Sequence, residues 1–413
     1  MSVRWPALMA GFMLCGGAQA DDDWLGGFAL ASQEATRLQA TPLNVDNFLA
    51  IPTNKTTLAG LLEGRFHDLT WRARFETRRS DIDGQRGASS ATLQELNRVF
   101  QLTPAVTLSL GKRLYALDPS FVNQPLGFLQ KRTDLSDPLD ELGQSEGLPM
   151  AVLGWTGSQA SLTAIYSKDA ARHADGYNRG VEQSIIKIGY EFERLSASVL
   201  LRRASGESNG IGATLSGAVG EQLSWYGSAY SARGTQRPIA GAVLSGGGDA
   251  TPAFLRSDDG RRYQRATVGL TCTLPGLSKL QLEYAFDGRG LSEGEFDRWL
   301  ALIDRNQSLP LPLPDAARKG LQAQAAQMLV SQGARQRYLS VSLGQTVGDW
   351  ELGGGVYAGQ DDHSAVWHGT ADYHYSPRTT LMLSALRQTS AARTERGLSP
   401  LGSTFALRVR RLF

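Results

Sequence analysis

Thr404–Phe413, which reads TFALRVRRLF, is the stretch that decides the fold. Apolar and polar residues alternate along it. One face carries Phe405, Leu407, Val409 and Phe413, and the other carries Thr404, Ala406, Arg408 and Arg410. Arg411 interrupts the apolar face near its end. A period of two predicts a β-strand that is apolar on one side and polar on the other.

The same alternation recurs in segments of about ten residues from about Thr57 to the C-terminus, as transmembrane strands require. Leu69–Glu76 and Ala266–Leu274 are clear examples. Short and long connections alternate between the segments, which is typical of a membrane barrel with tight turns on one side. A soluble β-sandwich would also alternate, so the period leaves both folds open.

The short connections separate these two folds. They are predicted at His67-Asp68, Pro104-Ala105, Gly157-Ser158, Glu193-Arg194, Gly220–Gln222, Pro275–Ser278, Thr346–Asp349 and Ser376–Thr379. Aromatic residues of the apolar faces gather near them, namely Trp71, Tyr190, Phe192, Trp225, Trp350, Tyr373 and Tyr375. An aromatic girdle suits a membrane–water boundary, whereas a sandwich gives no reason for one. We therefore predict an all-β fold, a transmembrane antiparallel β-barrel.

The strand count follows from the turns. Counting from Thr57 gives about seventeen segments, and a short turn at His67 requires one more strand before them. Leu43–Ile51 is the candidate, so the prediction is a barrel over residues 43–413 with about 18 strands, or about 16 if weak edges are lost. A barrel of this size encloses an aqueous channel. Residues 21–42 are expected to form an N-terminal periplasmic segment.

The N-terminus reads as an export signal. Met1–Ala20 has Arg4 at its positive end, an apolar core over Trp5–Cys15, and the cleavage site Ala18-Gln19-Ala20. Beyond it no run approaches the roughly 18 uncharged apolar residues of a membrane helix. The formal net charge is +2, and Cys272 is the one cysteine after the signal, so no internal disulfide is expected.

Two long connections are expected to have roles of their own. Ala116–Pro149 is a long acidic loop with enough apolar residues to pack, and it is a candidate constriction. Its acids are Asp118, Asp134, Asp137, Asp140, Glu141 and Glu146. Asp287–Ala334 predicts two extracellular helices, the first with a capping box formed by Ser292 and Glu295. The second is expected to begin at Asp315 and to run to about Val330.

Basic residues gather on one inner wall of the predicted pore, because the last strand of a closed barrel lies beside the first. This wall consists of Arg65, Arg72, Arg74, Arg78, Arg113, Arg408 and Arg410. The opposite inward charges are sparser and mixed: Lys187, Glu191, Arg202, Glu283, Glu351 and Asp372. An acidic loop facing the basic wall would create a transverse field that favours anions. Alternatively, the arginines pair with Glu63, Glu76 and loop acids and keep a wet interior soluble.

Catalytic patterns are poor. His363 follows Asp361 and Asp362, and His368 and Asp372 lie about 13 Å apart along one strand. Asp372 and His374 are neighbours on one face, but nothing supplies a nucleophile or a third ligand. The Gly-rich run Ser245–Gly248 lacks the lysine of a phosphate loop. We expect no catalytic residue, metal, cofactor or nucleic-acid partner.

The mature chain resembles Gram-negative outer-membrane porins and alginate-export-type barrels. Thr107–Leu129, in which Gly111-Lys112-Arg113 ends a strand and Pro119 to Gly127 follows, is similar to their passage from a strand into an inward loop. The terminal Phe413 resembles the signal that the barrel-assembly machinery reads in that group. The resemblance implies an outer-membrane location among lipid and lipopolysaccharide.

The resemblance also implies diffusion or export of small hydrophilic solutes, either anionic or saccharide. Two other readings stay open. One is a sealed barrel that serves as an envelope anchor or binds a polymer. The other is a hydrolase at the outer rim, which would depend on His363.

Overall fold

The computed structural model describes most of the chain after the predicted export signal. The described residues are 23–82, 87–129, 142–168, 182–205, 209–234, 239–244, 250–255, 260–274, 278–308, 319–323, 325–326 and 334–413. The predicted signal at residues 1–20 lies outside these ranges.

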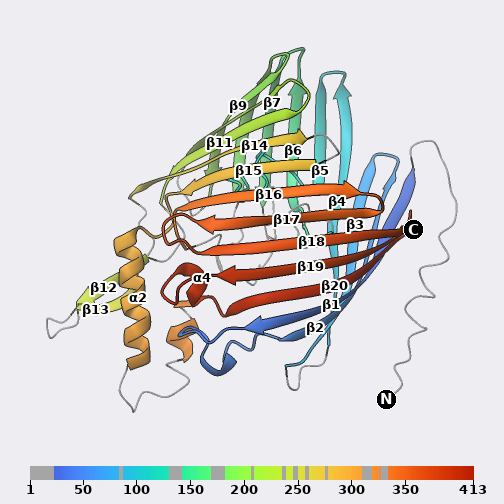
Figure 1. Ribbon diagram of the computed structural model, residues 1–413. Coiled ribbons are helices and arrows are strands. Elements are labelled where there is room, and N and C mark those ends of the chain that lie inside the picture. The colour runs from blue at the N-terminus through green and yellow to red at the C-terminus, as the bar shows by residue number, and fades with distance from the viewer. Residues whose placement is uncertain are drawn as a thin grey trace.

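Eighteen antiparallel strands form one closed sheet (Figure 1). The first nine are β1 (Trp24–Leu38), β2 (Asn54–Phe66), β3 (Leu69–Ser80), β4 (Ala88–Thr103), β5 (Val106–Arg113), β6 (Leu148–Thr156), β7 (Ala160–Lys168), β8 (Glu182–Glu191) and β9 (Leu195–Ala204). The others are β10 (Gly210–Val219), β11 (Leu223–Arg233), β14 (Arg262–Leu274), β15 (Ser278–Asp287), β16 (Arg337–Val347), β17 (Trp350–Gly359), β18 (Ala365–Ser376), β19 (Thr379–Thr389) and β20 (Leu401–Leu412). Each pairs with the next along the chain, and β1 pairs with β20 to close the barrel. The predicted fold class and the count of about eighteen are confirmed.

The eight predicted short turns all lie between consecutive strands of the sheet. The C-terminal end of β20 and the start of β1 lie at the same end of the barrel as these turns (Figure 1). The long connections are at the other end. One of them contains a separate hairpin of β12 (Ile239–Leu244) and β13 (Ala250–Leu255). The expected alternation of turns and loops is therefore correct.

The outer face of the sheet is apolar and exposed. On β20, Phe405 and Leu407 are 60% and 52% exposed, whereas the intervening Ala406 and the following Arg408 are buried inside the barrel. Similar exposed apolar side chains occur on every part of the closed sheet. A surface of this size and composition requires a hydrocarbon environment. A soluble sandwich is excluded, because the sheet closes on itself instead of packing on a second one.

The predicted start of the barrel is wrong. β1 is Trp24–Leu38, so residues 21–42 are not a periplasmic segment. Leu43–Ile51 is a connection that contains the short helix η2 (Val45–Asn47) and no strand. The alternation of β1 was hidden because its inward face carries the buried Phe28 and Leu30. Its outward face carries mainly small and polar residues. The inward face is therefore not polar and the outward face not strongly apolar, as the prediction of a transmembrane strand would require.

A small apolar core lies beyond the barrel at its long-loop end. Helix α2 (Glu293–Ser308) contributes Phe296, Trp299 and Ile303 to it, and the β1–β2 and β19–β20 connections contribute Leu43 and Leu398. Leu398 ends the short helix α4 (Glu395–Leu398).

One half of the predicted capping box is present at the start of α2, since the Ser292 backbone N–H donates to the Glu295 carboxylate at 2.9 Å. The Ser292 hydroxyl donates to the same carboxylate at 2.8 Å. Residues 319–323 and 325–326 are also helical, while Asp315 lies outside the described residues. Within the part of the chain that the structure describes, no helix has both the length and the hydropathy for crossing a bilayer.

Candidate pore and constriction

A buried carboxylate holds the start of the long β5–β6 connection against the inside of the barrel. We call residues 114–129 the first limb of this connection. Glu283 of β15 is 1% exposed, and it accepts hydrogen bonds from the backbone N–H groups of Phe121 at 3.0 Å, Val122 at 3.3 Å and Asn123 at 2.7 Å. The hydroxyl of Tyr226 donates to the same carboxylate at 2.9 Å. Because hydrogen bonds to a charged acceptor are strong, they fix this turn on the wall.

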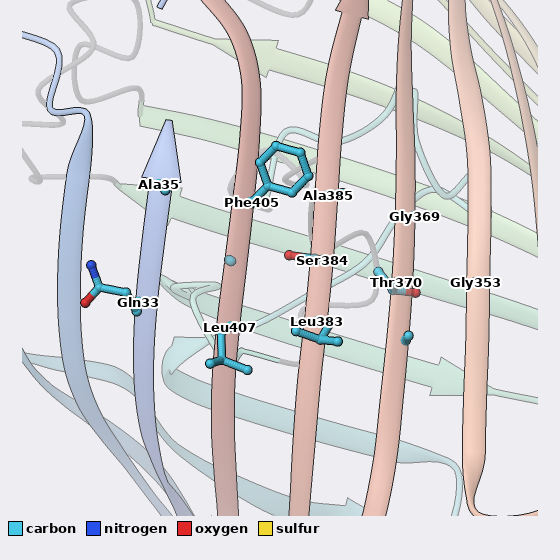
Figure 2. A pocket seen from close by; sticks show the side chains of 12 residues that line it. Gln33, Ala35, Gly353, Gly369, Thr370, Leu383, Ser384, Ala385, Phe405 and Leu407 are labelled. Atoms are coloured by element: carbon cyan, nitrogen blue, oxygen red, sulfur yellow. The ribbon is translucent and has the colours of Figure 1, made fainter. Parts of the chain in front are cut away.

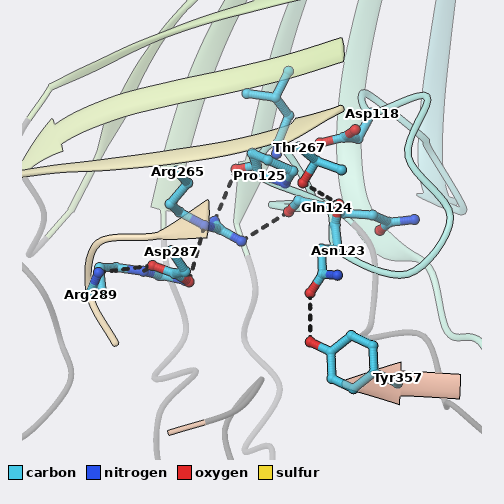
Figure 3. A network of polar contacts seen from close by, with 10 residues as sticks. Asp118, Asn123, Gln124, Pro125, Arg265, Thr267, Asp287, Arg289 and Tyr357 are labelled. Atoms are coloured by element: carbon cyan, nitrogen blue, oxygen red, sulfur yellow. Dashed lines mark hydrogen bonds and ion pairs between the residues drawn. The ribbon is translucent and has the colours of Figure 1, made fainter. Parts of the chain in front are cut away.

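Two further strands hold the same turn (Figure 3). Arg265 of β14 donates to the carbonyl oxygens of Pro125 and Gln124, both at 2.9 Å. On the other side of the turn, the Tyr357 hydroxyl donates to Oδ1 of Asn123 at 3.0 Å. Barrel side chains thus satisfy several backbone polar groups of the first limb, as a segment buried away from water requires.

The first limb also buries apolar side chains inside the pore. Leu126 and Leu129 are fully buried. Their neighbours are inward-facing residues of successive strands, namely Met150, Val152, Ile165, Ile185, Leu200 and Tyr230. Removing this apolar surface from water stabilises the docked limb by about 25 cal/mol for each Å² buried. The limb is part of the folded interior and covers the wall that β6–β11 and β14–β15 form.

The other end of the connection contacts the opposite wall. We call residues 142–147 the second limb. Arg74 of β3 donates to the carbonyl oxygens of Leu142 and Gly143, and Gln94 of β4 donates to Gly143 at 2.7 Å. Leu142 packs in a cluster whose other members are Phe28, Leu30, Ala59, Leu61 and Met382. Since β4 is the fourth and β15 the thirteenth of the eighteen strands, the two limbs contact opposite sides of the lumen. The two described limbs of the connection therefore lie against opposite walls inside the barrel.

The two acids of this connection that the structure describes already have hydrogen-bond or ion-pair partners. Asp118 accepts the backbone N–H groups of Ser120 at 3.0 Å and Leu126 at 2.7 Å, so it stabilises the turn itself. Glu146 forms an ion pair with Lys112. The remaining predicted acids Asp134, Asp137, Asp140 and Glu141 lie outside the described residues. Neither described acid is paired with the predicted basic wall.

The residues of the basic wall lie on one arc of the barrel, on β20, β2, β3 and β5, but several of them have acidic partners. Arg74 is 2.8 Å from Glu76, which also pairs with Arg78. Arg72 lies 3.6 Å from Glu63. These pairs match the alternative in which the arginines neutralise inward acids.

The other basic residues differ in height along the barrel. Arg65 donates to the carbonyl oxygen of His67 at the short-turn end. Arg113 stacks over Tyr115 at 5.3 Å. Arg408 donates to Ser384 at 2.8 Å, and Arg410 follows it on the inward face of β20.

The register across β20, β1, β2 and β3 places two arginines in one row. Arg408 pairs with Ser32, Ser32 with Thr57, and Thr57 with Arg78. We call these four residues the lumen row. The Arg78 side chain is 55% exposed, so water reaches the lumen at this height. Neither limb of the long connection covers the exposed Arg78.

The histidines that the structure describes are not assembled into a reactive site. His374 lies 3.8 Å from Glu351 and 3.4 Å from the Thr380 hydroxyl. The serine that follows His363 donates its hydroxyl to Asp362 at 2.8 Å. Among the described residues, no group of three or more His, Cys, Asp or Glu side chains could hold a metal ion.

Sequence reasoning missed the anchors of the loop. Glu283 was assigned to a sparse charged wall, and Arg265 and Tyr357 were not selected. A signal was nevertheless present, because apolar residues occupy inward positions on four successive strands. These positions are Val152, Ile165, Ile185 and Leu200. Inward apolar residues are out of place in a wet lumen, so they mark the wall that a loop covers.

A closed eighteen-stranded sheet with an exposed apolar outer face is a transmembrane β-barrel of the outer-membrane type. Solved structures share this fold. Pseudomonas aeruginosa OccK5 (OpdH) is 9% identical with a TM-score of 0.53, covering 95% of this chain and 98% of that one. Pseudomonas aeruginosa OpdL is 10% identical with a TM-score of 0.50, covering 95% and 99%.

A mutant of the Rhodopseudomonas blastica porin is 12% identical with a TM-score of 0.43, covering 95% and 100%. No protein-family model matches the sequence, and no curated protein matches it. The barrel and its outer-membrane location agree with the resemblance that the sequence indicated.

Proposed function

We propose that this protein is an outer-membrane channel whose preferred solutes are small, hydrophilic and anionic. The observation that carries the proposal is the lumen row, in which Arg408 and Arg78 flank two hydroxyl side chains, Ser32 and Thr57. Hydroxyl and guanidinium groups all donate hydrogen bonds to anions. Arginine is suited to carboxylate and phosphate groups because it presents a planar set of donors.

The position of the long connection supports a route along this row. The first limb covers the wall formed by β6–β11 and β14–β15, and the apolar side chains there are buried beneath it. The arc of β20 and β1–β3 keeps inward charges, of which Arg78 is the most exposed in the lumen row. A solute that passes the constriction would therefore travel beside the arginines. Low-dielectric walls strengthen their field and raise the local anion concentration.

The acidic partners of these arginines limit the anion selectivity. Glu76 and Glu63 offset part of the charge of Arg74, Arg78 and Arg72. The selectivity is therefore expected to be moderate and to depend on Arg78 and Arg408. Acidic saccharides fit this chemistry, since they combine a carboxylate with hydroxyl groups, but inorganic and small organic anions fit it as well.

Planar-bilayer recordings in a salt gradient test both parts of the proposal. The wild type should show defined conductance steps and a reversal potential on the anion-selective side. The double variant Arg78→Gln/Arg408→Gln should shift that potential toward the non-selective value. Arg411→Gln, which removes an outward charge from the same strand, should leave it unchanged. A cation-selective wild type would refute the anion preference.

A sealed barrel is the second candidate, and the apolar core at the long-loop end favours it. That core joins α2, the β1–β2 connection and α4 at this end of the barrel. An envelope anchor of this kind would insert into a bilayer without producing current steps. The absence of steps from correctly folded protein would therefore support the sealed barrel and refute the channel.

A further inference from the structure

A row of outward-facing polar residues crosses the seam where the barrel closes. The register pairs Arg37 of β1 with Ser403 of β20, Ser403 with Arg387 of β19, and Arg387 with Trp367 of β18. We call these four residues the seam row. Both arginines are exposed, and Trp367 is 52% exposed. All four lie at the long-loop end of their strands, on the face that contacts the membrane.

Figure 2 shows an apolar groove of about 570 Å³. In the strand register it begins directly below the seam row. Its lining includes the small residues Ala35, Gly369 and Ala385, which occupy the next outward positions on β1, β18 and β19. Phe405 and Leu407 stand beside them on β20 and project from the outer face. The groove exists because small side chains here lie between larger apolar ones. Its length runs from the seam row toward the centre of the membrane.

We propose that the seam row and this groove bind one phosphorylated lipid of the outer leaflet. Its phosphate lies between Arg37 and Arg387, and one acyl chain lies in the groove below. Two strand spacings separate the arginine backbones by about 10 Å, which two long guanidinium side chains can bridge around a single phosphate. Ser403 lies between them and adds a hydroxyl donor. Trp367 occupies the interfacial level, where an amphipathic ring is favoured.

Among the described residues, no acidic side chain pairs with the arginines of the seam row. Neither Arg37 nor Arg387 forms an ion pair or a side-chain hydrogen bond within the described part of the chain. The outward faces of the described strands offer few acids with which a second copy could supply one. Of the acids in the described barrel strands, only Glu182 shares the outward face, and it already contacts Tyr166 and Lys168. Charge complementarity therefore favours an anionic lipid over another copy of this chain.

The two ends of the lipid-facing surface also differ in charge. At the short-turn end the outward residues are mainly aromatic and aliphatic. At the long-loop end the outward face carries basic residues around the barrel, namely Arg37, Arg79, Lys168, Arg203, Arg233, Arg262, Arg337 and Arg387. Basic residues near a membrane surface are attracted to anionic headgroups. The asymmetry indicates that the leaflet at the long-loop end is the anionic one.

Native mass spectrometry of the full-length protein released from detergent tests the proposal. The probe is a diphosphorylated lipid A, and the comparison probe is the same lipid after removal of both phosphates. The wild type should retain one phosphorylated lipid and little of the dephosphorylated one. The variant Arg37→Gln/Arg387→Gln should bind the phosphorylated lipid about 25- to 30-fold more weakly, taking roughly a fivefold loss per arginine.

Two further variants make the result specific. Arg378→Gln/Arg411→Gln removes two arginines at the short-turn end, one in the β18–β19 turn and one on β20, and should bind like the wild type. Ala385→Phe fills the groove without changing charge and should also weaken binding. Heat-dependent gel migration confirms that each variant is folded. Equal retention by the wild type and the seam-row variant, or equal retention of both probes, would overturn the proposal. So would a specific dimer or trimer that retains no lipid. These readouts do not depend on conductance.

Discussion

Replacing Glu283 by glutamine should release the first limb while leaving the barrel intact. The carboxylate accepts five hydrogen bonds, four of which come from Phe121, Val122 and Asn123. A glutamine keeps one acceptor oxygen and turns an NH₂ group toward donors. At least two charge-assisted bonds are therefore lost, at about 1.5–3 kcal/mol each, so the docked limb should be destabilised by about 3–6 kcal/mol.

The closed sheet should tolerate this change, because its eighteen strands pair independently of the loop. Single-channel recording should show a larger mean conductance with frequent steps, because the limb no longer holds one position. Protease added to micelles should cleave residues 114–129 faster than in the wild type. Glu351→Gln is the matched control, since it neutralises an inward carboxylate that is 60% exposed.

Conductance, noise and cleavage that match the wild type would refute the reasoning. The limb would then be held by its apolar contacts, and the hydrogen bonds to Glu283 would be of little net value. A collapse of the whole barrel would also contradict the prediction, because the limb is expected to come loose without any loss of strand pairing.

Three further predictions concern packing and pH. Leu126→Ala should destabilise the docked first limb by about 2–5 kcal/mol through the cavity it leaves, measured as faster proteolysis of residues 114–129 with unchanged barrel melting. Trp299→Ala should destabilise the outer core by about 3–5 kcal/mol and raise hydrogen exchange in α2, while exchange in the barrel strands stays slow. The side-chain hydrogen bond from Thr53, followed by the one from the Asn54 backbone, lowers the pKa of Asp81 to about 2. A carboxyl group with a lowered pKa stabilises the folded form above its unfolded pKa of about 3.9, and this contribution is lost as pH falls toward 2. The protection factor of the Thr53 amide against exchange should therefore fall between about pH 4 and pH 2 in the wild type, and this fall should be absent in Asp81→Asn.

The strands and short turns were predictable because their signals are local. Alternation along Leu69–Glu76 or Thr404–Phe413 follows from a strand that separates lipid from water, and each segment shows it without reference to any other. A turn of two or three residues is similarly visible in the sequence. The position of Phe413 at the end of the last strand agrees with this pattern, and its role as an assembly signal remains a prediction.

The first strand and the loop anchors were not predictable in this way. Phe28 and Leu30 face inward because Leu142 packs on them from a connection more than a hundred residues away. Glu283 acts on backbone N–H groups, which every residue except proline has, so no sequence pattern identifies its partners. The residues of the predicted basic wall lie on one arc of the barrel, on β20, β2, β3 and β5, but which arginines pair with Glu76 or Glu63 depends on side-chain geometry.

The amino-acid sequence by itself determined that this chain forms a membrane barrel, where its turns lie and how many strands it has. These features follow from residue-by-residue partition between hydrocarbon and water, which needs no distant partner. Only the tertiary structure decided where the long connection lies, which wall it covers and which arginines remain along the open arc. Those features depend on contacts between residues far apart in the chain, which form only after the sheet has closed.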